Sequence, residues 1–427
     1  MDYNSAIKYI ENATVLGSKR GFDNFGKLLE LLGNPQKKLK FIHVAGTNGK
    51  GSVSTMIYSV LIEQGYNTGI FTSPHLNKYN ERFSFNNILI SDEDFSYYVN
   101  LIKEATEKLF YNSDDYFCFF EIMTAIAFCY FYDKKADYVV LETGLGGRMD
   151  NTNIIEKPVL SIITSISLDH TQYLGDTLEA IAYEKAGIIK DNCPVVLFPQ
   201  KKEIYRVFKE VADNKNAPLY YVDDYNCKIL ENNFNEIVFS TCNPIISYDK
   251  IKIKLIGNYQ ILNACNALVA IKALKDNGII ISNEAVYNGL EKAKINGRME
   301  IISNNPTVII DGAHNEGGIE QLCNYLVELK KKYSVTVLFG VLNDKNYSSM
   351  LNKLYKVADK LIITQPNNKR AMNCNELSNI LENKNKLIGV KNNYTEALKL
   401  ALSETTDILV CCGSIYLIGD IRRSFDV

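Results

Sequence analysis

Residues 41–52 read FIHVAGTNGKGS, and this stretch sets the architecture of the first part of the chain. Its apolar start is typical of a buried parallel strand, its middle is dense in small residues, and apolar residues at helical spacing follow from Ser52 to Gly65. A strand, a glycine-rich turn and a helix form a cradle for phosphate. Glycine lets backbone N–H groups approach the anion, and the helix N-terminus adds partial positive charge.

A lysine and a hydroxyl within this turn make the prediction more specific. Lys50 would supply a cation for terminal phosphates, and Ser52 a hydroxyl for Mg²⁺. The common phosphate-loop pattern has a glycine where this chain has Val44, and it lacks the intervening Gly51. An ordinary glycine-rich turn is therefore the alternative. The residues that we expect to hold the nucleotide are Gly46, Thr47, Asn48, Gly49, Lys50, Gly51 and Ser52.

Composition limits the classes of function. A chain of 427 residues suggests two or three domains, and 46% hydrophobic residues suffice for sizeable cores. The formal net charge of −2 offers no general basic field for nucleic acid. The polar N-terminus does not resemble a signal peptide, no apolar run is long enough for a membrane span, and the ten cysteines form no CxxC pair. We expect a cytoplasmic monomer with free thiols and no nucleic-acid or membrane partner.

Two further strands are predicted to end on titratable side chains. The strand Asp137–Glu142 ends on an acid, which is where many nucleotide enzymes hold Mg²⁺. The strand Val159–Ile166 is followed closely by Asp169-His170, and a helix then ends near Lys185. That lysine could be an ordinary helix-end cation before a capping glycine.

The segment Lys294–Glu300 is typical of an interdomain linker, because Gly297 interrupts the pattern before a second series of strands and helices. Strands that alternate with helices indicate a parallel sheet covered on both faces. We therefore expect a domain over residues 1–295 and another over 296–427, with the chemistry in the cleft between them.

The motifs resemble those of one known family. GTNGKGS is similar to the signature of the Mur ligase superfamily, and the other motifs resemble the folylpolyglutamate synthase and dihydrofolate synthase branch. These motifs are SPHL…ER at 73–82, FExxT at 120–124, ETGLGGRxDxTN at 142–153, DHxxxLGxTxxxIAxEKAGI at 169–188, GxxQxxNA at 257–264, DGAHN at 311–315 and Asp344-Lys345. The resemblance implies an α/β protein with a P-loop parallel-sheet ATPase domain, followed by a smaller Rossmann-like C-terminal glutamate-ligase domain.

The resemblance also implies roles for individual residues. Catalysis would involve Lys50, Glu142, His170, Lys185, Arg298 and His314. ATP would also be bound by Asn263, Arg298 and Asp311. Two Mg²⁺ ions would be held by Ser52, Ser73, Glu142, His170 and a carbamylated Lys185. Substrate would be bound by Ser73, Pro74, His75, Arg82, Phe120, Glu121, Arg148 and Ser414. For Glu121, a structural hydrogen-bond acceptor is an equal alternative, because a carboxylate in apolar surroundings needs a partner.

The implied reaction is ATP-dependent amide formation, in which an acyl phosphate is attacked by the amine of L-glutamate. Only 45 residues precede Gly46, too few for the UDP-binding domain of the peptidoglycan ligases, so the substrate is expected to be a folate or dihydropteroate. The motifs do not separate enzymes with one of these activities from enzymes with both. The alternatives are another Mur-type amino-acid ligase, a P-loop kinase or NTPase, and a non-catalytic nucleotide-binding regulator.

Overall fold

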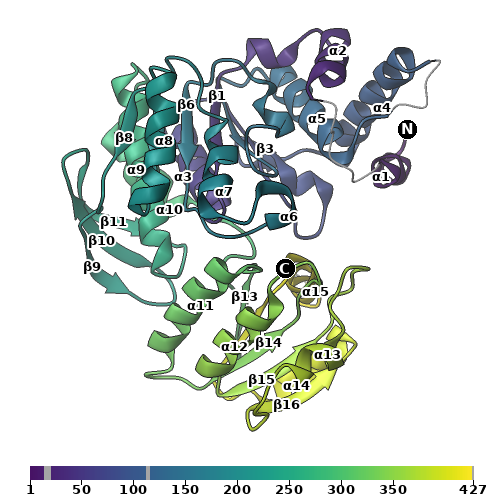
Figure 1. Ribbon diagram of the computed structural model, residues 1–427, viewed down its shortest axis with the longest axis vertical. Helices are drawn as coiled ribbons and strands as arrows, with labels where there is room; N and C mark the ends of the chain where they lie inside the picture. The colour runs from purple at the N-terminus through teal and green to yellow at the C-terminus, as the bar shows by residue number, and fades with distance from the viewer. Residues whose placement is uncertain (14–20, 112–115, 426–427) are drawn as a thin grey trace.

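The chain forms two lobes stacked along its long axis (Figure 1). The computed structural model describes residues 1–13, 21–111 and 116–425. The upper lobe holds every described element up to α10, and the lower lobe holds the elements from β12 onward. The predicted α/β class is confirmed, with one mainly parallel sheet in each lobe.

The first sheet places the strand of the FIHVAGTNGKGS stretch near its centre. Strand β1 (Phe41–Ala45) pairs in parallel with β5 (Tyr138–Glu142) on one side and with β6 (Leu160–Ile163) on the other. The eight strands run in the order β4-β3-β2-β5-β1-β6-β7-β8. The remaining strands are β2 (Thr68–Phe71), β3 (Phe83–Phe85), β4 (Ile88–Leu89), β7 (Val195–Leu197) and β8 (Leu219–Tyr221). Strands β3 and β4 are antiparallel, so the sheet is mixed at one edge.

Helices cover both faces of this sheet. Side chains that alternate along β1 point to opposite faces: Ile42 and Val44 join the core under α3, α9 and α10, whereas Phe41 joins the core under α1, α2, α4 and α5. Helices α7 and α8 cover the rest of that second face. The helices are α1 (Tyr3–Asn12), α2 (Asp23–Leu31), α3 (Lys50–Glu63), α4 (Asp92–Leu109), α5 (Phe119–Asp133), α6 (Thr171–Leu174), α7 (Leu178–Ala186), α8 (Lys202–Asn214), α9 (Tyr259–Asp276) and α10 (Asn283–Lys292). Short 3-10 turns lie at η1 (Pro35–Lys38), η2 (Tyr79–Arg82) and η3 (Asn151–Ile154).

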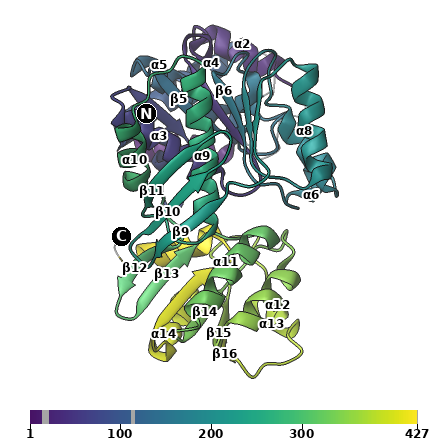
Figure 2. The ribbon, with the colours of Figure 1, turned by 90° about the vertical axis from the view of Figure 1, so that its left-hand side faces the viewer.

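A three-stranded antiparallel sheet follows the first sheet in the chain, where polar alternation in residues 228–240 and 248–257 is typical of strands. It consists of β9 (Cys227–Asn232), β10 (Ile237–Cys242) and β11 (Ser247–Ile253). Figure 2 shows these strands beside α9, reaching from the upper lobe toward the lower one. Their buried residues Ile237, Phe239 and Ile251 extend the core that α3 and α9 share.

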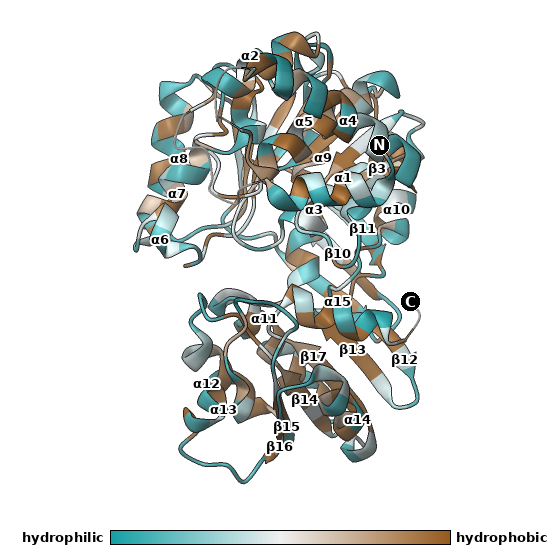
Figure 3. Ribbon diagram, turned by 90° about the vertical axis from the view of Figure 1, so that its right-hand side faces the viewer, coloured by the Kyte–Doolittle hydropathy of each residue, from teal (hydrophilic) through white to brown (hydrophobic). Residues whose placement is uncertain are grey.

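The lower lobe is a second α/β sheet. Its strands run in the order β12-β13-β17-β14-β15-β16, and all pair in parallel except β12 with β13. The strands are β12 (Glu300–Asn304), β13 (Thr307–Asp311), β14 (Val335–Phe339), β15 (Lys360–Thr364), β16 (Leu387–Lys391) and β17 (Ile408–Cys412). The helices are α11 (Glu316–Leu329), α12 (Tyr347–Val357), α13 (Cys374–Asn379), α14 (Tyr394–Glu404) and α15 (Ile415–Arg423). The apolar strands lie inside, and the outer faces of the helices are polar (Figure 3).

Two helix starts differ from the sequence-based expectation. Helix α3 begins at Lys50 rather than Ser52, because Gly49 adopts a left-handed conformation (φ 87°) and acts as its N-cap. The aromatic-rich, largely apolar run Asp115–Tyr132 predicts a buried helix. The observed helix α5 begins at Phe119, after the N-cap Cys118, and Asp115 lies outside the described residues. No helix within the described residues is long and apolar enough to cross a membrane.

Candidate active site

A cavity of about 270 Å³ lies between the two lobes. Its walls come from the loops after β1, β2, β5, β6 and β13 together with the first turns of α9 and α11. The carboxyl ends of parallel strands form the ligand-binding edge of an open α/β sheet, and here two such edges face each other.

The loop after β1 depends on glycine at two positions. Gly46 has φ 153°, and a Cβ there would lie 1.7 Å from Thr164 Oγ1. Gly49 has φ 87°, and a Cβ there would lie 2.5 Å from Asn263 Oδ1. The loop is therefore held closely between β6 and α9, with only main-chain atoms at these two points.

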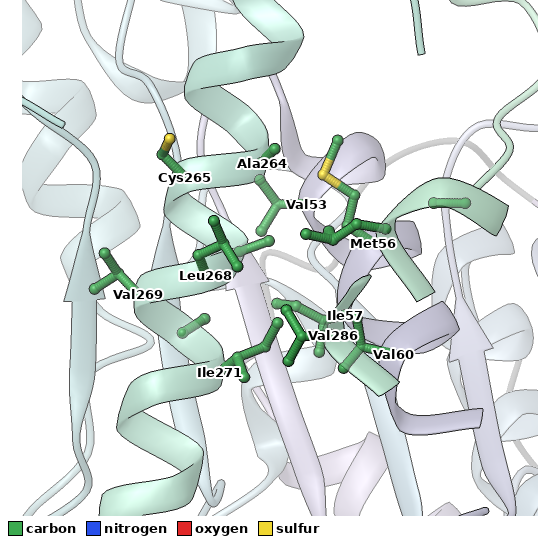
Figure 4. Close-up of a cluster of buried hydrophobic side chains, with 14 of the residues drawn as sticks. Val53, Met56, Ile57, Val60, Ala264, Cys265, Leu268, Val269, Ile271 and Val286 are labelled. Carbon is green, nitrogen blue, oxygen red and sulfur yellow. The ribbon is translucent and has the colours of Figure 1, made fainter. Parts of the chain in front are cut away.

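Apolar packing holds Asn263 in that place. Helices α3 and α9 interdigitate through buried residues, among them Val53, Met56, Ala264 and Leu268 (Figure 4). Asn263 itself is buried in the first turn of α9, where its Nδ2 donates to Gln260 Oε1 at 2.9 Å. A close-packed helix pair thus positions a polar group against the glycine loop.

Lys50 and Glu142 form the charged centre of the first lobe. Lys50 Nζ donates to Gly46 O at 3.1 Å and lies 4.0 Å from Glu142 Oε1. Glu142, at the end of β5, is only 3% exposed and accepts a hydrogen bond from Ser73 N at 3.3 Å. Burial raises the pKa of the Glu142 carboxyl, and the Lys50 ammonium opposes that shift.

Lys185 points into the cavity instead of capping its helix. Its Nζ donates to Gly46 O at 2.8 Å, and the residue is 4% exposed. Burial, followed by repulsion from Lys50, lowers the pKa of Lys185 to about 7. The next residue but one, Gly187, is the C-cap with φ −60°, so it does not form the left-handed glycine cap that a helix-end interpretation favours.

Asp169 and His170 follow β6 at the same edge. Asp169 is buried, and although burial alone would raise its pKa, the neighbouring His170, Lys345 and His314 lower it below the usual range. Lys345 Nζ donates to Asp169 Oδ1 at 2.7 Å. His170 adopts a left-handed conformation (φ 51°), and its ring is more exposed than the Asp169 carboxylate.

The second lobe contributes Arg298, Asp311 and His314. The two Asp311 oxygens accept hydrogen bonds from Met299 N (2.9 Å), Ala313 N (2.9 Å) and Tyr259 Oη (3.3 Å), which ties the linker to β13. His314 Nδ1 lies 2.7 Å from Gly312 O, so it carries a proton that it donates to this carbonyl. Burial lowers the pKa of His314 to about 4, and the ring is neutral at pH 7.

The residues predicted for catalysis, for ATP and for metal all line this cavity. They are Gly46, Thr47, Asn48, Gly49, Lys50, Gly51, Ser52, Ser73, Glu142, His170, Lys185, Asn263, Arg298, Asp311 and His314. Pro74, predicted to bind substrate, lines it as well.

The other predicted substrate residues lie outside the cavity lining. His75 Nδ1 accepts from Arg82 Nε at 2.9 Å, and the Arg82 guanidinium lies 5.1 Å from the centre of the Phe119 ring. Burial lowers the pKa of Arg82 to about 10 and that of His75 to about 3. The buried Arg82 and the partly buried His75 and Phe119 thus form an aromatic and cationic cluster beside the loop after β2.

Four of the predicted substrate residues make contacts within the fold, and their roles toward substrate stay predictions. Arg148 pairs with Glu184 at 2.8 Å on an exposed surface. Glu121 Oε2 accepts from Cys118 N at 2.8 Å as part of a capping box, which agrees with the alternative that Glu121 is a structural hydrogen-bond acceptor. The Phe120 ring packs against Gly144, and Ser414 caps α15 by accepting from Tyr416 N at 3.2 Å. Motif matching identifies these positions without saying which way their side chains point.

Four residues were not assigned a role from the sequence: three line the cavity, and Lys345 lies beside it through its contact with Asp169. Asp169 and Lys345 stand in recognised motifs, and their direct contact across the lobes required the fold. Tyr259 and Gln321 carried no signal in a single sequence; both line the cavity, from α9 and α11 respectively.

Comparison with known proteins first gives the class. Residues 119–271 match the Mur ligase middle domain, and residues 297–415 match the Mur ligase glutamate ligase domain. A phosphate loop in one lobe, a glutamate ligase domain in the other and a cavity lined by both define an ATP-dependent ligase of the Mur type.

Individual relatives then give the family. The chain is 39% identical to the dihydrofolate synthase/folylpolyglutamate synthase of Bacillus subtilis, over 99% of this chain and 98% of that protein. The crystal structure of folylpolyglutamate synthase from Thermotoga maritima matches with a TM-score of 0.86 and 33% identity, covering 100% of this chain and 97% of the other. A solved FPGS–AMPPCP–folate complex matches with a TM-score of 0.86 and 29% identity over 99% of both chains. The chain belongs to the folylpolyglutamate synthase/dihydrofolate synthase family.

Proposed function

We propose that this enzyme uses ATP to join L-glutamate to a carboxylate of a folate, giving ADP and phosphate. The observation that carries the proposal is the cavity into which Lys50 and Lys185 of the first lobe and Arg298 and His314 of the second lobe project together. A simple kinase or NTPase leaves the second, glutamate ligase lobe without a role.

The residues divide the reaction between the lobes. The γ-phosphoryl group of ATP moves to an oxygen of the folate carboxylate, and ADP leaves. The amine of glutamate then attacks the acyl carbon, the C–O bond to phosphate breaks, and the amine loses a proton. Lys50 and Arg298 stabilise charge on the phosphoryl group during transfer, and main-chain N–H groups of the glycine loop bind the phosphates.

The oxygen donors beside Lys50 fit Mg²⁺. Glu142 and Ser52 are both buried at the loop, and Glu142 accepts from the main chain of Ser73. Among the described residues, no three His, Cys, Asp or Glu side chains cluster as a metal site. That suits Mg²⁺, which commonly takes one or two carboxylates and completes its shell with water and phosphate oxygens. When bound there, Mg²⁺ neutralises charge on the phosphates.

The second metal position would use His170 and a carbamylated Lys185. A carbamate forms when an uncharged amine attacks CO₂ and releases a proton. With a pKa near 7, Lys185 has a substantial uncharged fraction at neutral pH, whereas an ordinary lysine has almost none. The product carries negative charge and two oxygen donors, which converts a group that repels Mg²⁺ into one that binds it.

The substrate would enter along the loop after β2. Ser73 and Pro74 line the cavity, and the cluster of His75, Arg82 and Phe119 lies on the same loop or against it. An Arg82 cation among aromatic rings suits a ligand that is aromatic and anionic at once. We also propose a first, ATP-binding unit over residues 1–295 and a second, glutamate-ligase unit over 296–427; the segment between α10 and β12 supports this division.

The same cavity is also proposed to join glutamate to dihydropteroate, because the Bacillus subtilis relative is named for both activities. A substrate panel tests both proposals. ATP and glutamate are supplied with tetrahydrofolate or with dihydropteroate, and ADP and product mass are followed. We expect a glutamate adduct from each acceptor. ADP formation without an acceptor, or no adduct with either one, contradicts the proposal.

A further inference from the structure

A hydrogen-bonded cluster of four polar side chains joins the lobes beside the cavity. Asn48 and Asp169 come from the first lobe, and Asn315 and Lys345 come from the second. Asn315 Nδ2 donates both to Asp169 Oδ2 (2.9 Å) and to Asn48 Oδ1 (3.0 Å), and Lys345 Nζ donates to Asp169 Oδ1 (2.7 Å). Each Asp169 oxygen thus has a donor from the opposite lobe. We call these four residues the interdomain clasp.

The first-lobe side of the clasp is part of the phosphate loop. Asn48 lies between Thr47 and Gly49, and its Nδ2 donates to Ser167 Oγ at 3.1 Å. Thr47 Oγ1 donates to Ser167 O at 3.1 Å and accepts from Ser167 N at 3.1 Å. These hydrogen bonds fix the nucleotide loop and the 165–169 segment as one unit, so Asn315 contacts the loop that holds phosphate.

The second-lobe side of the clasp is the start of α11. Asn315 is the N-cap of this helix, and its Oδ1 accepts from Gly318 N at 2.8 Å while its Nδ2 reaches across the interface. The contact is close, because a Cβ on Gly317 would lie 2.9 Å from Ser167 Oγ and 3.1 Å from Asn48 Nδ2. The fixed direction of the cap amide sets the angle at which α11 meets the phosphate loop.

We propose that Asp169 is a positioning residue, and that through the clasp it holds the second lobe closed on the phosphate loop during catalysis. The inference rests on the proposed ligase function. It assigns Asp169 no contact with the reacting atoms. The clasp sets the distance between Lys50 and Arg298, two cations that act from different lobes, and charge stabilisation falls steeply with misplacement.

The Asp169–Asn315 pair allows a test by exchange. In Asp169→Asn, an amide donor faces the Asn315 donor, and we expect kcat for ligation to fall about tenfold or more while KM for ATP stays within about threefold. Asn315→Asp alone places two carboxylates together, and its kcat should fall by as much as that of Asp169→Asn. The double variant D169N/N315D restores one donor and one acceptor, keeps a good N-cap, and lets Asn48 donate to the new carboxylate by rotating its amide. We expect it to recover at least half of the lost activity on a logarithmic scale.

A steric variant and a charge control distinguish loss of the clasp from a nonspecific effect of substitution on the fold. Gly317→Val places a wedge between α11 and the first lobe, against Ser167 and Asn48, and leaves all four clasp residues chemically unchanged. It should lower kcat in the same way as Asp169→Asn. Lys353→Met removes an equally close Lys–carboxylate pair, to Glu320 at 2.8 Å, but both partners lie in the second lobe, and its kcat should equal that of the parent.

Small-angle scattering with AMPPCP gives a readout that needs neither folate nor glutamate. The parent should be more compact than Asp169→Asn and Gly317→Val, and the double variant should return toward the parent. The proposal is overturned if the single variants keep parental kcat and compactness, or if the double variant is no more active than Asp169→Asn. A parent that makes no glutamate adduct, yet compacts with AMPPCP in a clasp-dependent way, overturns the proposed function and leaves the clasp standing.

Discussion

Two strand–loop–helix units face each other across the cavity, and they are built on different principles. The unit β1–α3 meets the cavity through glycines whose surroundings leave no room for a Cβ. The unit β13–α11 meets it through the side chains of Asp311 and His314, and Asn315 contacts the first lobe beside it. The first unit is suited to bind phosphate by its main chain. The second presents hydrogen-bonding groups whose direction depends on where the whole lobe sits.

The two units also differ in how they are supported. Helix α3 is buried against α9 and α10 by a continuous apolar core (Figure 4). The N-terminus of α11 meets the first lobe through polar contacts and a glycine. A close-packed apolar contact is rigid, whereas a polar contact can be made and broken with little change in free energy. The comparison indicates a fixed nucleotide half and a movable half.

The sharpest test of the fixed half is Lys50→Ala. Lys50 contacts loop carbonyls and faces the cavity, so its loss should reduce turnover about 10³-fold, since it removes a charge aimed at the transferring phosphoryl group. The melting temperature should stay within a few degrees of the parent. Steady-state ADP release measures turnover, and thermal unfolding measures stability. Near-normal turnover of Lys50→Ala would contradict the assignment of residues 46–52 as the phosphate loop.

Replacing Lys185 should have the next largest effect. We expect Lys185→Ala to lose about 100-fold in activity and to regain part of it with acetate, which can supply the missing carboxylate oxygens. Because the pKa of Lys185 is near 7, its uncharged form increases as pH rises through 7. The carbamate signal from ¹³CO₂ in a ¹³C NMR spectrum should therefore grow between pH 6 and 8.

A second, partly buried lysine gives the control for that experiment. Lys190 also donates to a main-chain carbonyl, Asn153 O at 3.0 Å, but it does not line the cavity. Lys190→Met should leave the NMR signal unchanged, and Lys185→Met should remove it. A signal that survives in Lys185→Met would place the modification elsewhere.

The movable half should respond less strongly to loss of one side chain. His314→Ala removes one hydrogen-bonding group, and we expect kcat to fall about tenfold, the equivalent of about 1.4 kcal/mol. With a pKa of about 4, His314 is neutral from pH 6 to 8, so the loss should be the same across that range. Full activity of His314→Ala, or a loss that changes with pH, would show that the second unit works differently.

Arg148→Ala should have the smallest effect. Arg148 is half exposed and paired with Glu184, so its removal should cost about 0.5 kcal/mol of stability and change the KM for folate less than twofold. A much higher KM for folate would restore the substrate-binding role that its motif suggests. Thermal unfolding and initial rates on one preparation decide between the two.

The sequence predicted the first unit better than the substrate loop, for a physical reason. Gly46, Gly49 and Lys50 are constrained locally, because strand, turn and helix are adjacent in the chain and their residue types follow from that geometry. The directions of the side chains of Arg82, Arg148 and Ser414 depend on which groups lie nearby after folding. Arg82 donates to His75, Arg148 pairs with Glu184, and Ser414 caps α15. Motifs gave their identity, and only tertiary structure gave their direction.

The same limit applies across the lobes. Asp169 and Lys345 were visible in the sequence as separate motifs, 176 positions apart, and nothing local indicates that they touch. Helix starts were also shifted, since Gly49 takes the N-cap that the apolar pattern alone cannot locate. Periodicity reports which face is buried, and capping depends on backbone conformation.

The position of β17 has a consequence for how the protein is made. This strand, Ile408–Cys412, lies between β13 and β14, so the second sheet has a gap at its centre until the ribosome has delivered nearly the whole domain. At about 5–20 residues per second, β13 and β14 wait on the order of several seconds for their shared partner. During that time their apolar edges are open to pairing with other chains. A growing chain that stalls after β16 would leave those edges exposed for the whole of the pause.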